Sequence, residues 1–161
     1  MRHEADMRFI YGLMIGIVLA QLGLALVPIG AEQPQITDEM YESYATLDLH
    51  RTWHDGTDIY ITPDIKPITE LAEQYNTPSA AEEFVMSIPY VNDTTNHGRI
   101  EYWAFPAETL YLNGGDCEDR AFLFVSIVRA QGNQARCIDF MGHMYAQARS
   151  NNSAEWVDYL A

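Results

Sequence analysis

Three residues in the second half of the chain carry side chains that together could break an amide bond: Cys117, His143 and Asp158. A cysteine thiolate is a nucleophile, an imidazole takes up and returns the proton, and a carboxylate orients the imidazole. Cys117 follows Gly114-Gly115-Asp116 and precedes an apolar run, so the pattern predicts a helix that begins at the cysteine with Asp116 as its N-cap. The free N–H groups of a first helical turn favour both a thiolate and an oxyanion. The sequence therefore predicts a nucleophile at Cys117.

The elements that must position these side chains indicate an α+β domain. Helices are predicted over residues 37–53, 67–76, 79–88, 106–110 and 117–131, and strands over residues 134–141, 143–149 and 155–160. The helix that starts at Cys117 is apolar on nearly all sides and ends at Gly132, so we expect it to be buried against a small antiparallel sheet. His143 and Asp158 would then lie on neighbouring strands at one end of that sheet.

The first 31 residues differ from the rest of the chain. An apolar run over residues 9–27 follows Arg2 and Arg8 and precedes many acidic residues. This pattern predicts a signal peptide or an N-terminal membrane anchor, with residues 32–161 forming one domain outside the cytoplasm. We therefore expect a protein that is either secreted or held to the membrane through residues 9–27.

The charge of the chain excludes one class of partner. The 161 residues carry a formal net charge of −14, and Lys66 is the only lysine. Because nucleic acid binding depends on lysine and arginine contacts to phosphates, we expect no nucleic acid partner. The composition also resembles the acidic surfaces of proteins from high-salt habitats.

The text GGDCEDRAFLFVSIVRAQG, which spans residues 114–132, resembles the transglutaminase-like superfamily of papain-type cysteine enzymes, in particular its archaeal and bacterial predicted proteases. The resemblance extends over about residues 80–148. It implies a transglutaminase-like core in which Cys117 attacks a peptide or amide carbonyl and forms a thioester. It also implies that His143 is the base and that an acid, Asp158 or alternatively Glu155, completes the triad.

The acidic residues around the cysteine oppose the thiolate. Asp116, Glu118 and Asp119 place three carboxylates beside one thiol. Some periplasmic members of the same superfamily bind calcium through acids that flank the cysteine, and carboxylate oxygens suit this ion. We therefore expect a calcium site among these three residues, although the reaction itself requires no cofactor. In the alternative interpretation, Asp116 caps the helix and an arginine pairs with one of the other acids.

Two further residue pairs have a functional and a simpler interpretation. His50 and His54 have helical spacing and could bind zinc, but the sequence offers no third ligand nearby, so we expect solvent-facing or capping side chains instead. Cys117 and Cys137 could form a disulfide in an oxidising compartment, whereas Cys137 in an alternating strand is also explained as a packed small side chain.

A function of another class is also consistent with the same fold. The aromatic residues of the segment 90–103 could contact a partner. The chain would then be a binding or structural module without catalytic activity. Its intact cysteine and histidine argue for the enzyme, because neither side chain is required for packing.

Overall fold

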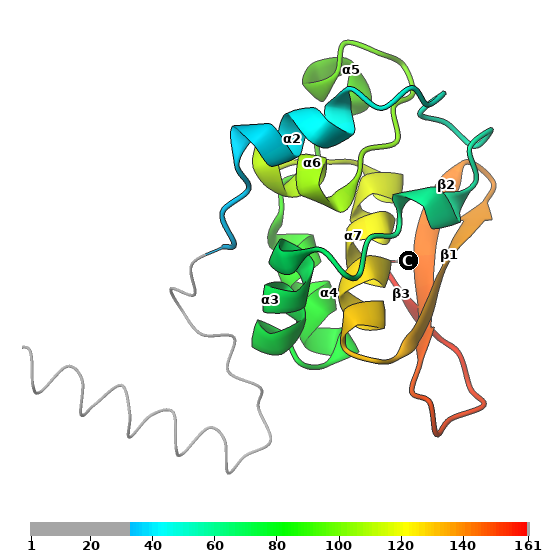
Figure 1. The fold of residues 1–161 in the computed structure, drawn as a ribbon. Coiled ribbons are helices and arrows are strands. Elements are labelled where there is room, and N and C mark those ends of the chain that lie inside the picture. The colour runs from blue at the N-terminus through cyan, green and yellow to red at the C-terminus, as the bar shows by residue number, and fades with distance from the viewer. Residues whose placement is uncertain (1–32, 161) are drawn as a thin grey trace, which may run out of the picture. The chain divides into compact units, whose positions relative to one another are not determined.

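The structure, a computed structural model, describes residues 33–160 of the chain (Figure 1). Helices precede a sheet, as the α+β prediction requires. The helical elements are α2 (Asp38–Ala45), the 3-10 helix η1 (Thr57–Tyr60), α3 (Lys66–Gln74), α4 (Pro78–Ser87), α5 (Asp93–Asn96), α6 (Pro106–Leu112) and α7 (Cys117–Ala130), and the strands are β1 (Gln134–Phe140), β2 (His143–Arg149) and β3 (Val157–Tyr159).

Helix α7 lies at the centre of the described region. It packs against β1 and β2 on one side and against α3, α4 and α6 on the other (Figure 1). Its apolar side chains from Ala121 to Val128 are fully buried, which is why the helix has no solvent-facing polar stripe over this stretch. The prediction that the cysteine starts a buried helix packed on the sheet is confirmed.

The sheet is antiparallel, with the strand order β1-β2-β3. A two-residue turn joins β1 to β2, and both of its residues, Met141 and Gly142, have positive φ angles of 54° and 78°. Such turns match the twist of the flanking strands. In β2 the alternate residues Met144, Ala146 and Ala148 are buried against α7, so His143 belongs to the opposite set.

The helices before α7 follow the predictions with one clear exception. Helices α3 and α4 lie where they were expected, and the Thr77 side chain caps α4 through the N–H of Ala80. The prediction of one helix from residue 37 to about 53 is wrong. Thr37 does cap α2, but the helix ends at Ala45. Residues after it turn inward, and Arg51 takes a positive φ of 62°.

Burial of Arg51 explains why the first helix stops early. Its guanidinium is 2% exposed and lies 2.6 Å from the Glu108 carboxylate. The same guanidinium donates to the backbone carbonyls of Tyr44 and Trp103. A helix continued through residue 53 would not deliver Arg51 to these partners, so tertiary contacts override local helical preference.

The predicted signal or anchor segment lies outside the described residues. Within residues 33–160, no helix combines the length and the apolar character needed to cross a membrane.

Candidate active site

Cys117 is the first residue of α7 and lines two cavities. The thiol is half-buried and donates a hydrogen bond to Glu118 Oε2 at 3.0 Å. Burial raises the pKa of the Cys117 thiol to about 12, and the carboxylates of Glu118 and Asp116 add to this effect, whereas the backbone N–H of Met144 acts in the opposite direction. The thiol is therefore neutral in this arrangement, and the N-terminus of the helix does not outweigh its acidic neighbours.

Asp116 occupies the N-cap position without acting as a cap. Its side chain accepts no hydrogen bond from the first turn of α7, so the predicted capping interaction is wrong. Within residues 33–160 its buried Oδ1 atom has no hydrogen-bond partner. The carboxylate instead lies beside Glu118, whose pKa is raised to about 8 by burial and by Asp116.

The larger cavity beside the sulfur has a volume of about 590 Å³. Its wall contains the exposed Trp53 and the buried Trp103 together with carboxylates and backbone. The acidic residues that line it are Glu101, Asp116, Glu118 and Asp139. A cavity of this size with aromatic and acidic walls fits an extended or cationic organic group better than an anion.

His143 lines the smaller cavity, of about 290 Å³, which it shares with Cys117, Arg120 and Met144. The structure therefore brings the predicted nucleophile and the predicted base to one cavity. The His143 side chain is exposed, and no hydrogen bond joins its ring to the sulfur in the part of the chain that the structure describes.

Asp158 does not lie beside His143. The strand register pairs Asp158 with Gln147, and its carboxylate accepts a hydrogen bond from Gln147 Nε2 at 2.7 Å. Gln147 lies four residues beyond His143 along β2, a separation of about 13 Å in a strand. The alternative acid, Glu155, precedes β3, and its backbone N–H donates to Ser153. Neither acid is positioned to orient the base in this arrangement.

The predicted calcium ligands do not converge on one point. Asp116 and Glu118 lie together with Cys117, Glu118 also lies with Asp93 and Glu101, and Asp119 lies with Asp93 and His97. Asp119 is 1% exposed and accepts a hydrogen bond from the backbone N–H of Ala104 at 2.8 Å. Its carboxylate therefore faces the segment before α6.

Sequence reasoning missed Asp93, a buried residue at the start of α5. Its Oδ2 atom accepts a hydrogen bond from the backbone N–H of Tyr102 at 2.6 Å. Burial raises the pKa of Asp93 to about 7, and burial also holds the pKa of Asp119 well above its ordinary value. The spacing of Asp93 and His97 was an available signal, because residues four apart lie on one face of a helix. We call Asp93, Asp116, Glu118 and Asp119 the acidic cluster.

The other two residue pairs take their simpler interpretation. His50 and His54 do not lie on a helix, and the His50 ring contacts Asp55 at 3.0 Å. Cys117 and Cys137 are free thiols, and Cys137 packs against the core.

Comparisons of the chain with protein-family models, with curated proteins and with solved structures found no match. The function must therefore be inferred from the residues and their arrangement.

Proposed function

We propose that the protein is a cysteine hydrolase of transglutaminase-like fold that cleaves a peptide or amide bond. The observation that carries this proposal is the position of Cys117, at the start of a buried helix and in the lining of a cavity. A structural cysteine would pack away from such a cavity. The imidazole of His143, which lines a cavity shared with Cys117, and the GGDCED motif at residues 114–119 add support.

The reaction begins when the Cys117 thiol gives its proton to His143 and the sulfur attacks the substrate carbonyl carbon. The carbonyl oxygen becomes an oxyanion, which the backbone N–H of Cys117 can stabilise. Collapse of this intermediate breaks the C–N bond, and the leaving amine takes the proton from His143. Water then attacks the thioester, releases the carboxylic acid and restores the thiol.

The third member of the triad remains a proposal. Asp158 is held opposite Gln147, about 13 Å along β2 from His143, so it would reach the His143 ring only after a rearrangement of β3. Cys117 and His143 can act as a dyad, because a histidine alone activates a cysteine in this type of chemistry.

Calcium would remove the electrostatic obstacle at the sulfur. The orphaned Oδ1 atom of Asp116 and the neighbouring Glu118 carboxylate offer oxygen ligands that suit this ion. Two neutralised carboxylates would no longer raise the pKa of the Cys117 thiol. Asp119 is separated from this pair by its bond to Ala104 and is not needed for it.

The protein would work outside the cytoplasm, either secreted or anchored through residues 9–27. Its substrates would be exported proteins or peptides. The acidic wall of the larger cavity favours substrates with basic side chains near the cleaved bond.

The non-catalytic alternative also has one observation in its favour. The neutral thiol donates to Glu118, so the resting arrangement lacks a thiolate. Under this alternative Cys117 is an inert side chain in a binding module.

Alkylation of the full chain with iodoacetamide at about pH 6 separates the two functions. In the presence of Ca²⁺ we expect Cys117 to react at least about tenfold faster than glutathione, which serves as the unperturbed thiol because Cys137 is buried against the core. His143→Ala should remove this advantage, whereas His54→Ala, at an exposed histidine that lines neither cavity, should preserve it. A Cys117 rate equal to that of glutathione, or no effect of His143→Ala, would reject the enzyme.

A further inference from the structure

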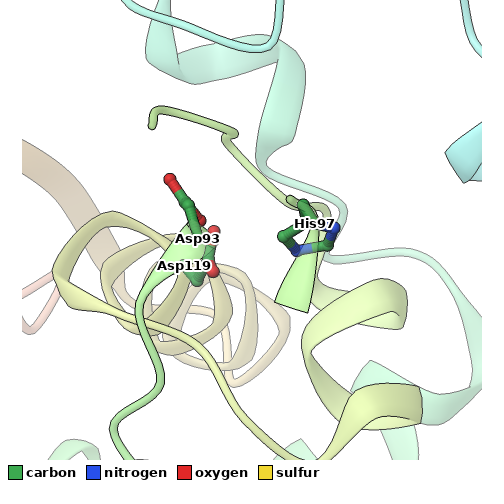
Figure 2. A group of neighbouring side chains, drawn as sticks. All are labelled: Asp93, His97 and Asp119. Atoms are coloured by element: carbon green, nitrogen blue, oxygen red, sulfur yellow. The ribbon is translucent and has the colours of Figure 1, made fainter. Parts of the chain in front are cut away.

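A second group of side chains lies beside the start of α7, on the side of the segment 102–104. Asp93 comes from the start of α5, His97 from its end, and Asp119 from the first turn of α7 (Figure 2). One ligand atom from each residue lies within 4.8 Å of the other two. Asp93 is 3% exposed and Asp119 1% exposed, so both carboxylates are closed off from solvent, and His97 is half-buried. Two helices, α5 and α7, thus bring three polar side chains to one buried point.

The buried carboxylates at this point form no ion pair within residues 33–160. None of the described ion pairs includes a member of the acidic cluster. The buried Arg51 is committed to Glu108, and Arg120 donates to the backbone carbonyl of Ile88. Buried carboxylates are normally paired or coordinate a metal ion.

Two polar atoms of the group point to a ligand. Asp93 Oδ1 and His97 Nε2 are both buried, and neither has a hydrogen-bond partner among the described residues. Leaving such an atom unsatisfied costs about 1–3 kcal/mol. The orphaned oxygen belongs to a side chain that is almost completely buried, and the orphaned nitrogen belongs to a ring stacked on Tyr102 with centroids 3.9 Å apart. The ring is therefore held in place beside the carboxylates.

We propose that Asp93, His97 and Asp119 bind a divalent first-row transition metal ion, for which Zn²⁺ is the probe. An imidazole nitrogen with two carboxylate oxygens is a donor set that zinc and its neighbours accept, and calcium has no preference for the nitrogen. Ligands at about 2.0–2.2 Å from a tetrahedral zinc ion lie about 3.3–3.6 Å apart, so binding would draw the three side chains together by up to about 1 Å. Three protein ligands leave a tetrahedral ion one further position.

The bound ion would stiffen one wall of the larger cavity. The second oxygen of Asp93 holds the N–H of Tyr102, and that of Asp119 holds the N–H of Ala104. Trp103, which lines the cavity, lies between these two anchored residues. The metal site does not depend on catalysis by Cys117, and the two proposals can fail separately.

The test uses the full chain with Cys117→Ser and Cys137→Ser, which removes thiols as competing zinc ligands. Titration calorimetry with Zn²⁺ should give one ion per chain. His97→Ala should weaken the affinity by at least about 100-fold, since even residues that only support a metal ligand contribute about 10–100-fold. His54→Ala should leave the affinity unchanged. Equal zinc affinity in His97→Ala and its parent would overturn the proposal.

A measurement that needs no change in the site guards against a misfolded variant. Cu²⁺ bound to the same parent should show nitrogen hyperfine coupling in its electron paramagnetic resonance spectrum. Excess Ca²⁺ should not displace the copper. Loss of the copper signal with Ca²⁺, or a spectrum without nitrogen coupling, would identify an oxygen-only site and reject the histidine ligand.

Discussion

Two groups of buried carboxylates contact Tyr102, and they differ in whether an arginine pairs with them. The Tyr102 hydroxyl donates to Glu108, whose charge is met by Arg51 at 2.6 Å, while the Tyr102 backbone N–H donates to Asp93 of the acidic cluster. Carboxylates on the first side have an arginine, whereas those on the second have no cation among the described residues. The first group is complete as a structural element. The second is the group for which we propose a metal ion.

The largest expected effect comes from removing the buried ion pair between Arg51 and Glu108. Arg51→Met should lower the free energy of unfolding by about 3–5 kcal/mol, because it leaves the buried Glu108 charge unpaired. Urea denaturation of the full chain, followed by tryptophan fluorescence, measures this loss. The same substitution at the exposed Arg136, which bonds to Gln147, should cost less than about 1 kcal/mol. Similar losses in both variants would mean that the Arg51 pair contributes no more than a surface contact.

The acidic cluster, which has no arginine, should make the free energy of unfolding fall as the pH rises. Burial raises the pKa of Asp93 to about 7 and that of Glu118 to about 8, from ordinary values of 3.8 and 4.5. Between roughly pH 4 and pH 8 the folded chain therefore binds more protons than the unfolded chain, so the free energy of unfolding decreases by up to about 1.4 kcal/mol per pH unit for each group. Asp93→Asn should flatten this slope in urea titrations with EDTA present. An unchanged slope would contradict the assignment.

The smallest effect, of opposite sign, should come from Asp55. The Tyr60 hydroxyl donates to Asp55 at 2.7 Å and is the main reason that the pKa of this carboxyl lies below its ordinary value. This contribution to stability is present above the ordinary pKa of 3.8 and is lost as the pH falls further. Asp55→Asn should remove that acid-side loss in a series of thermal melts below about pH 4. Asp48→Asn, at an exposed position, provides the control; an identical change there would refute the role of the Tyr60 bond.

The sequence predicted those parts of the fold that local patterns decide. The apolar run after Cys117 predicted the buried helix α7, and the strand pattern over residues 143–149 predicted β2 with the bounds that the structure has. The early end of α2 could not be predicted in the same way. It depends on Arg51 meeting Glu108, 57 residues away, and no local pattern encodes that contact.

In the candidate site, too, local sequence predicted some features and long-range contacts decided the others. Cys117 and its acidic neighbours are adjacent in sequence, so their conflict was predictable. Asp93 and Asp119 meet across 26 residues, and Asp93 in isolation reads as a turn residue after Asn92. The distance of Asp158 from His143 follows from strand register, which composition and turn residues do not determine here.

Gly115, two residues before the nucleophile, is constrained by its contact with Asp119. A Cβ atom added at this position would lie 2.7 Å from Asp119 Cβ and 2.9 Å from its Oδ2. The glycine therefore provides the space that the Asp119 carboxylate occupies, rather than flexibility before the nucleophile. Because every residue except glycine carries a Cβ atom, a substitution at 119 that removes only the carboxylate leaves the 2.7 Å contact in place. Gly115 should consequently be kept among descendants of this chain even where Asp119 has changed, unless the start of α7 itself shifts.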